Sequence, residues 1–422
     1  MGSEVRRRKA EVIGTRKIRS GSVWVAVSRA PYAFCVVDAM GVVRLLGKRQ
    51  PDNMRTYNLR PITETAEQAL QAKGQKEKIA KQILLGIDAH LKSYQVCRKI
   101  DAGGLQPVQS FSLEKLLLFA YKQRQLAEKV YAVYEAGPLG YVLYRKLREL
   151  GIEALVCAPE CLEGGSKRKN NKIDASKLTG RLYSYLSGDR YGLRIVRVPS
   201  PEQEQLRARS RQHVQLVRTR KALAAQGRSL LLAEGYSTKG SWWRPGAFSK
   251  LRASIPEWIC QELALWQANL ALLDQQIAEL KTELAQSQQG PRPKGAGALS
   301  LTQLDREVFD YHRFANTRSV GCFGGLCPSE HSTGDPSKQR LGSITKVGNP
   351  RIRVLLVEMA WRLVKFQPQY KPIQKWYQAL TGFNKALKKK AIVAVARRLF
   401  IDIWRIRTGR TTAQEVGLVL SD

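Results

Sequence analysis

Between residues 83 and 178, short apolar runs alternate with segments of helical spacing, and this alternation constrains the fold more than any other feature. Helical spacing places apolar residues three and four positions apart, as in 113–125, whereas short apolar runs bounded by turns are typical of strands. The expected strands are 83–90, 94–100, 107–111, 129–137 and 152–159, and the expected helices are 113–125, 140–150 and one entered from a basic loop within 164–178. This order predicts an α/β fold in which helices cover a mixed sheet.

The order of these elements is that of an RNase H-like fold. Three strands linked by brief turns suit a meander. They are followed by a helix, a strand, a helix, a strand and a helix, an alternation that builds a sheet with helices on its faces. We therefore expect an RNase H-like domain over residues 79–200.

The rest of the chain is predicted to be mainly helical. Residues 202–234 have the pattern of a long basic helix, and a second helix carries apolar residues at 263, 266, 270, 273, 277, 280 and 284. These alternate steps of three and four are typical of a coiled coil, and they fit a hairpin within one chain as well as a zipper between chains. The segment 235–256, with Trp242 and Trp243, has the composition of a loop insertion.

A polar Gly/Pro-rich linker at 286–297 indicates a domain boundary. The predicted divisions are a basic N-terminal extension of unknown fold at 1–78, the RNase H-like domain at 79–200, a helical or coiled-coil segment with an insertion at 201–288, and a mainly α-helical C-terminal domain at 289–422.

The charge balance indicates the kind of partner. The chain has 71 Lys and Arg against 35 Asp and Glu, a formal net charge of +36. Such an excess excludes most enzymes of small metabolites and indicates a polyanionic partner, so we expect a protein that binds nucleic acid. Because 43% of the residues are apolar, the chain can also bury a core.

Compartment is inferred mainly from what the sequence lacks. The seven cysteines are scattered without a CxxC pair, which argues against a structural zinc site and against a disulfide framework. The first residues are not followed by an apolar signal region, and charged residues interrupt the apolar stretch 23–46. We expect a soluble cytoplasmic, nucleoid-associated protein with no membrane partner.

Three carboxylates are candidates for a metal site. Asp88 and Glu135 come at the ends of two strands that we expect to be sheet neighbours, and Asp174 begins a helix that would pack beside the same strand ends. Clustered carboxylates repel one another unless a cation neutralises them, and Mg²⁺ prefers oxygen ligands. The sequence therefore predicts a Mg²⁺ site that holds a scissile phosphate. The alternative for Asp88 alone is an ordinary turn or cap residue.

Basic segments on both sides of the chain's centre are candidates for binding phosphates. The loop 342–353 combines hydroxyl, amide and cationic donors between glycines, which suits phosphate oxygens, although a solvated basic turn has the same composition. The candidate nucleic-acid-binding residues are Lys167, Arg168, Lys169, Arg340, Lys346, Arg351 and Arg353.

Several motifs, in order along the chain, resemble the DEDD-class insertion-sequence transposases, a group that includes Piv-type DNA invertases and bridge-RNA-guided recombinases. GIDAH (86–90), YEAGPLGY (134–141) and NNKIDASKL (170–178) resemble the family's acidic motifs. FGGLCPSEHSTGD (323–335) and LGSITKVGNPRIRVLLVEMAW (341–361) resemble its C-terminal domain. The resemblance covers roughly residues 80–365.

The resemblance implies a RuvC-like domain with four acidic metal ligands, a coiled-coil dimerisation segment and a C-terminal transposase domain that supplies a nucleophilic serine. It further implies a covalent phosphoserine intermediate, Mg²⁺ held by another subunit's carboxylates, a homo-oligomer (dimer or tetramer) and a guide RNA of the bridge type. Asp88, Glu135, Asn171 and Asp174 match the acidic positions, and Ser332 and Thr333 fall at the serine motif.

The sequence departs from the family pattern at two of these positions. Asn171 replaces an acid, which removes one negative charge while keeping a carbonyl ligand. Thr333, not a serine, precedes Gly334, and its branched Cβ makes it a more hindered nucleophile than the neighbouring Ser332. Two alternatives to a recombinase therefore stay open: a metal-dependent, structure-selective DNA nuclease and a catalytically impaired, nucleic-acid-binding remnant.

Overall fold

The computed structural model describes residues 36–37, 43–44, 79–159, 171–288, 290–331 and 340–421. Residues 1–75 and 76–422 form two separate units. In the first unit, β1 (Val36–Val37) pairs antiparallel with β2 (Val43–Arg44). The candidate residues Lys167, Arg168, Lys169, Ser332 and Thr333 lie outside the described residues, as do the side chains of Asn171 and Arg340.

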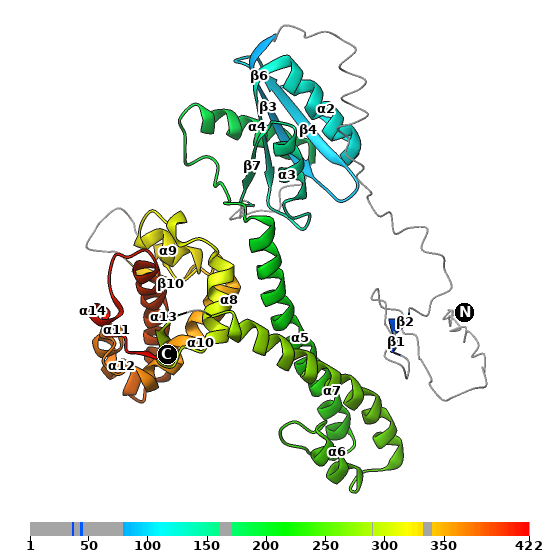
Figure 1. Ribbon diagram of the computed structural model, residues 1–422, viewed down its shortest axis with the longest axis vertical. Coiled ribbons are helices and arrows are strands. Elements are labelled where there is room, and N and C mark those ends of the chain that lie inside the picture. Colours follow the sequence, from blue (N-terminus) through cyan, green and yellow to red (C-terminus); the bar gives the residue numbers. More distant parts are fainter. Residues whose placement is uncertain are drawn as a thin grey trace, which may run out of the picture. The chain divides into compact units, whose positions relative to one another are not determined.

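A five-stranded mixed sheet begins the second unit. Its strands are β3 (Ala80–Ala89), β4 (Tyr94–Ile100), β5 (Gln109–Phe111), β6 (Ala127–Glu135) and β7 (Glu153–Cys157). They lie in the order β5-β4-β3-β6-β7, with the first three antiparallel and β3, β6 and β7 parallel (Figure 1). The predicted meander and the mixed α/β sheet are therefore confirmed.

Helices cover both faces of this sheet. α2 (Leu113–Leu126), α3 (Val142–Glu149) and α4 (Asn171–Leu186) complete the predicted order of three strands, helix, strand, helix, strand, helix. α4 packs closely on β3 because Gly86 has no side chain: the Gly86 N–H donates to Thr179 Oγ1 at 3.0 Å, and a Cβ there would overlap the Thr179 side chain. Tyr134 points to the other face, where its hydroxyl contacts Gly140 and Tyr144 at the start of α3.

A helical hairpin follows the sheet. α5 (Pro201–Ala233) begins with a capping box formed by Ser200 and Gln203, and it packs antiparallel on α7 (Glu257–Gln286). Five of the seven positions of the apolar seam are buried: Leu263, Leu270, Ile277, Leu280 and Leu284. The seam is thus used within the chain, as the hairpin alternative predicted. A coiled coil between chains stays a prediction.

The segment between the hairpin helices is part of a core, and its prediction as a loop insertion was wrong. It contains α6 (Pro245–Arg252), and Trp242 and Trp243 are buried in a cluster with residues of α5 and α7. Trp242 donates from Nε1 to the Ala224 carbonyl at 3.0 Å, and its ring lies against Gly227, where any Cβ would overlap it. The two tryptophans bury enough apolar surface to order a segment rich in glycine and polar residues.

The C-terminal part is mainly helical around one core, as predicted. Its helices are α8 (Ala298–Val308), the 3-10 turn η1 (Tyr311–Arg313), α9 (Thr317–Phe323), α10 (Pro350–Phe366), α11 (Lys371–Lys375), α12 (Tyr377–Thr381), α13 (Lys385–Arg407) and α14 (Ala413–Val416). β8 (Arg292–Pro293), within the Gly/Pro-rich segment, pairs with β11 (Leu420–Ser421), and β9 (Pro328–His331) pairs with β10 (Arg340–Ile344). In the described ranges, no helix combines the length and the apolarity needed to span a membrane.

Candidate functional site

The parallel pairing of β3 and β6 brings Asp88 and Glu135 to one edge of the sheet. Ile87 is in register with Tyr134, so the next pair along the two strands is Asp88 and Glu135. In parallel strands, residues in register point to the same face. That face is the one that α4 covers, because Gly86, two residues before Asp88, contacts α4.

α4 carries the third predicted carboxylate toward the same edge. Leu178 and Leu182 pack against Leu84 and Val133 of the sheet, and Asp174 precedes Leu178 by one helical turn on the same stripe. The three acids thus share one end of the α4-covered face. However, no group of three His, Cys, Asp or Glu side chains in the described part of the chain is arranged to hold a metal ion.

His90 is a neighbour of this edge that the sequence analysis did not single out. Its Nε2 lies 3.0 Å from Asp88 Oδ2, and the Asp88 side chain is largely buried, with 19% exposure. The sequence signal that could have indicated His90 is its position two residues after a strand-end aspartate. The contact shows that Asp88 Oδ2 already has a polar partner inside the protein.

A second constellation joins three helices around a buried carboxylate. Glu307 of α8 is only 3% exposed, and Arg211 of α5 binds it in two places, Nε to Oε1 at 2.7 Å and Nη2 to Oε2 at 2.8 Å. Asn349 donates to the same Oε2 at 2.8 Å. Burial alone would raise the pKa of Glu307, but the hydrogen bonds from Arg211 and Asn349 outweigh it and the pKa is lowered.

Asn349 connects this carboxylate to the basic loop. Its Oδ1 accepts from the backbone N–H groups of Arg351 and Ile352, at 3.0 and 3.5 Å, and so caps α10. Both ends of the Asn349 side chain are therefore engaged inside the protein. Glu307 was not found from the sequence, because its partner Arg211 is 96 residues away in the chain.

The predicted phosphate-binding residues of this loop differ in their availability. Arg353 is half-buried, and its Nη1 donates to the carbonyls of Gly324 and Lys346, both at 3.1 Å, so it holds the loop together. Lys346 is exposed and has a left-handed backbone, with φ of 54°. Arg351 is exposed, and its pKa is lowered, first by partial burial and then by repulsion from Arg211.

In the chain, the serine motif lies between β9 and β10 and outside the described residues. His331, the last residue of β9, is in register with Arg340, the first residue of β10. At the base of the hairpin, Thr345 N–H donates to the Cys327 carbonyl at 2.8 Å. Ser332 follows His331 directly in the chain. The basic loop that follows β10 is thus tied to the same hairpin base.

Comparison with known proteins finds a family match in the C-terminal part of the chain. Residues 292–374, from β8 through α11, match the Transposase IS116/IS110/IS902 family. This segment is similar to transposases of that family. The match includes the β9–β10 hairpin, the basic loop and Glu307.

Similar proteins extend the likeness beyond that segment. A putative transposase, y4rJ, of Sinorhizobium fredii is 29% identical over 307 residues, which is 65% of this chain and 76% of that protein. A second one from the same organism, y4qE, is 34% identical over 251 residues, 56% of this chain and 58% of the relative. The transposase for insertion sequence element IS1111A of Coxiella burnetii is 26% identical over 288 residues, 64% of this chain and 75% of that protein.

Proposed function

We propose that this protein is a DNA transposase that cleaves and rejoins DNA, with a RuvC-like, RNase H-like domain and a hydroxyl nucleophile from the C-terminal domain. The match of residues 292–374 to a transposase family carries the proposal. The shared edge of Asp88, Glu135 and Asp174 supports it, because carboxylates at the ends of adjacent strands are suited to phosphate chemistry with a metal.

Asp88, Glu135 and Asp174 would hold Mg²⁺, with Asn171 as a neutral fourth ligand. Their oxygen donors fit a hard cation, although they do not form a ready three-ligand group. When bound, Mg²⁺ would polarise the scissile phosphate.

Ser332 or Thr333 would attack the DNA phosphate. In this step a new Oγ–P bond forms and the P–O bond to the departing DNA strand breaks, while the hydroxyl proton is taken up, in the net balance, by the oxygen of that departing strand. The resulting ester retains the energy needed to rejoin the strands. The acids belong to the proposed RNase H-like domain and the hydroxyl to the proposed C-terminal domain, which is compatible with their supply by different subunits of a dimer or tetramer.

Double-stranded DNA and a structured guide RNA are the proposed partners. The net charge of +36 supports a polyanionic partner, and Arg351 lies near Arg207, Arg211 and Arg218 of α5, where one buried carboxylate, Glu307, offsets part of the charge. Sequencing of RNA that co-purifies with the protein tests for the guide.

A suicide DNA substrate tests the chemistry. We expect a covalent protein–DNA adduct whose mass maps to a peptide containing Ser332 or Thr333, and no adduct from the double variant Ser332→Ala/Thr333→Ala. The single variants assign the nucleophile. Cleavage that survives the double change, with a free 5′-phosphate and no adduct, would establish a nuclease instead.

Metal binding is tested without turnover. Mg²⁺ should raise the melting temperature of the wild-type protein, because a ligand that binds only the folded state stabilises it. Asp88→Asn should abolish the shift. An equal shift in both proteins would contradict the proposed ligands.

A catalytically impaired remnant is the second candidate, and the neutral Asn171 favours it. If the wild-type protein forms no adduct, Asn171→Asp, alone or with Thr333→Ser, should restore it. If these variants fold and bind DNA but still form no adduct, the hypothesis that Asn171 inactivated the acidic site is contradicted.

A further inference from the structure

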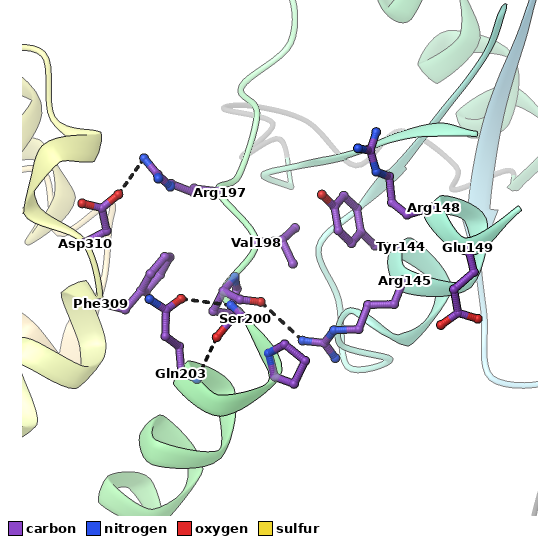
Figure 2. A pocket seen from close by; sticks show the side chains of 12 residues that line it. Tyr144, Arg145, Arg148, Glu149, Arg197, Val198, Ser200, Gln203, Phe309 and Asp310 are labelled. Atoms are coloured by element: carbon purple, nitrogen blue, oxygen red, sulfur yellow. Dashed lines mark hydrogen bonds and ion pairs between the residues drawn. The ribbon is translucent and has the colours of Figure 1, made fainter. Parts of the chain in front are cut away.

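A wide pocket lies where α3, the segment before α5 and the end of α8 meet. Its volume is about 840 Å³. Tyr144 and Arg148 come from α3, Arg197 and Val198 from the connecting segment, and Phe309 from the end of α8 (Figure 2). Figure 2 shows the Tyr144 ring directed toward Val198, with Phe309 on the other side next to Gln203. The pocket therefore has an aromatic side chain on each of two walls.

The walls carry more positive than negative charge. Arg145 Nη2 pairs with Glu204 Oε2 at 2.6 Å, and Arg197 Nη1 pairs with Asp310 Oδ2 at 2.7 Å. Arg148 is exposed and has no ion pair with any described residue. Glu149, the remaining acid of the lining, pairs with Lys146 at 3.2 Å. One cation of the wall is thus left without a counter-charge inside the protein.

Two further arginines surround Phe309. The guanidinium carbons of Arg207 and Arg313 lie 5.9 and 4.9 Å from the centre of its ring. The pKa of Arg313 is lowered, first by burial and then by repulsion from Arg197, so these cations are close enough to disfavour one another. An anion in the pocket would relieve this repulsion.

The backbone of Phe309 is also unusual. Its φ of 49° lies in the left-handed region, which costs energy for a residue with a bulky side chain. The Phe309 N–H donates to the Asp305 carbonyl at 2.7 Å, which ends α8 and directs the ring to the pocket wall. Strained residues of this kind often occur at binding sites.

We propose that this pocket binds a nucleotide with an unpaired base from a single-stranded segment of DNA or RNA, with its phosphodiester at Arg148 and Arg197 and its base against Tyr144 or Phe309. The inference rests on the proposed nucleic-acid function and adds a site outside the carboxylate edge and the β9–β10 hairpin. The volume falls in the range of about 300–1,000 Å³ that is usual for small-molecule sites. A duplex keeps its base faces stacked inside and cannot present them to the pocket, whereas an unpaired base can stack on an aromatic ring next to cations.

Photocrosslinking tests the location. Oligothymidylate with 5-bromodeoxyuridine and oligouridylate with 4-thiouridine are irradiated with the full-length protein, and the adducts are mapped by mass spectrometry. We expect adducts in the peptides that contain Tyr144 or Phe309. Adducts from one oligomer alone identify DNA or RNA as the source of the nucleotide. Adducts confined to other segments would overturn the proposal.

Arg148→Ala tests the phosphate contact. We expect it to weaken single-strand binding about tenfold, measured by fluorescence anisotropy, and to leave duplex binding unchanged. The matched control is Arg190→Ala, which removes an exposed arginine that stacks on Tyr185 outside the pocket. If both variants lose the same single-strand affinity, the effect of Arg148→Ala is due only to the change in net charge, and the proposal is overturned. Arg148→Lys should recover part of the affinity.

Together with the crosslinking, the suicide-substrate assay distinguishes failure of the pocket proposal from failure of the proposed transposase chemistry. Adduct formation at 332–333 without pocket crosslinks would reject the pocket and retain the transposase. Pocket crosslinks in a protein that forms no such adduct would retain the pocket and reject the chemistry.

Discussion

Glu307 is the residue whose charge has the clearest structural role. Glu307→Gln removes the charge from a carboxylate that is 3% exposed and is bound by Arg211 and Asn349. We expect a loss of about 2 kcal/mol in the free energy of unfolding. The hydrogen bonds to residue 307 would no longer be charge-assisted and would become weaker, and Arg211 would lose its counter-ion. Urea unfolding measures the loss. Glu283→Gln, at an exposed ion pair with Arg209, is the control and should change little.

The lowered pKa of Glu307 also fixes the sign of a pH effect. A carboxyl whose folded pKa lies below its unfolded value stabilises the fold above the unfolded value, here 4.5, and this contribution is lost as the pH falls through the folded pKa. The wild-type protein should therefore lose its advantage over Glu307→Gln in acid, below about pH 4.5. A difference between the two proteins that stays constant from pH 7 to about pH 3 would contradict this role.

The thiol reactivities of Cys322 and Cys327 give a second prediction at the scale of single residues. Their sulfurs lie 2.9 Å apart, and Cys322 is exposed whereas Cys327 is buried. Burial, and then the hydrogen bond and charge interaction with Cys322, raise the pKa of Cys327 to about 11. Because the thiolate is the reactive form, iodoacetamide should modify Cys322 first at pH 8, and Cys327 only as the pH approaches 11. Peptide mass mapping follows both sites, and equal rates at pH 8 would contradict the raised pKa.

Alanine substitutions at two helical glycines distinguish the effect of close packing on stability from that of helix propensity. Gly227 on α5 lies against the Trp242 ring, whereas at Gly180 on α4 a Cβ would meet no atom within 4 Å apart from its chain neighbours and its own helix backbone. Gly227→Ala should destabilise the hairpin by about 1–3 kcal/mol through overpacking. Gly180→Ala should leave stability unchanged or raise it by up to about 1 kcal/mol. Thermal unfolding and near-ultraviolet tryptophan dichroism measure both, and an undisturbed Trp242 signal in Gly227→Ala would contradict the packing.

The elements that the sequence predicted well are those whose signal is local. The strands around Asp88 and Glu135 are short apolar runs between turns, and their parallel pairing follows from the helix between them. The segment with Trp242 was misjudged because it packs on residues that are distant in the chain, as where the Trp242 ring lies against Gly227 of α5. Glu307 was missed for the same reason, since neither its burial nor its bond to Arg211 leaves a periodic pattern.

At the scale of the whole molecule, the excess charge should be concentrated in a few binding surfaces. The start of α13 has exposed Lys385, Lys389 and Lys390, and its first turn contains no acid. Lys385, in the first turn, opposes the helix dipole, which costs stability unless an anion binds there. If these lysines contact duplex phosphates, replacing all three with alanine should make the negative slope of log K against log salt concentration shallower by about three.

A control with the same net charge decides whether this surface is used. Lys115→Ala/Lys122→Ala/Lys129→Ala removes three exposed lysines from α2 and β6, and it should leave the slope unchanged. Fluorescence anisotropy with one duplex between about 50 and 200 mM salt gives both slopes, because each phosphate contact releases counterions when it forms. Since the α13 change removes an unfavourable helix–charge interaction, it should not lower the melting temperature, and weaker binding can be assigned to lost contacts. Equal slopes for the two triple variants would mean that the charge acts through the overall field and not through α13.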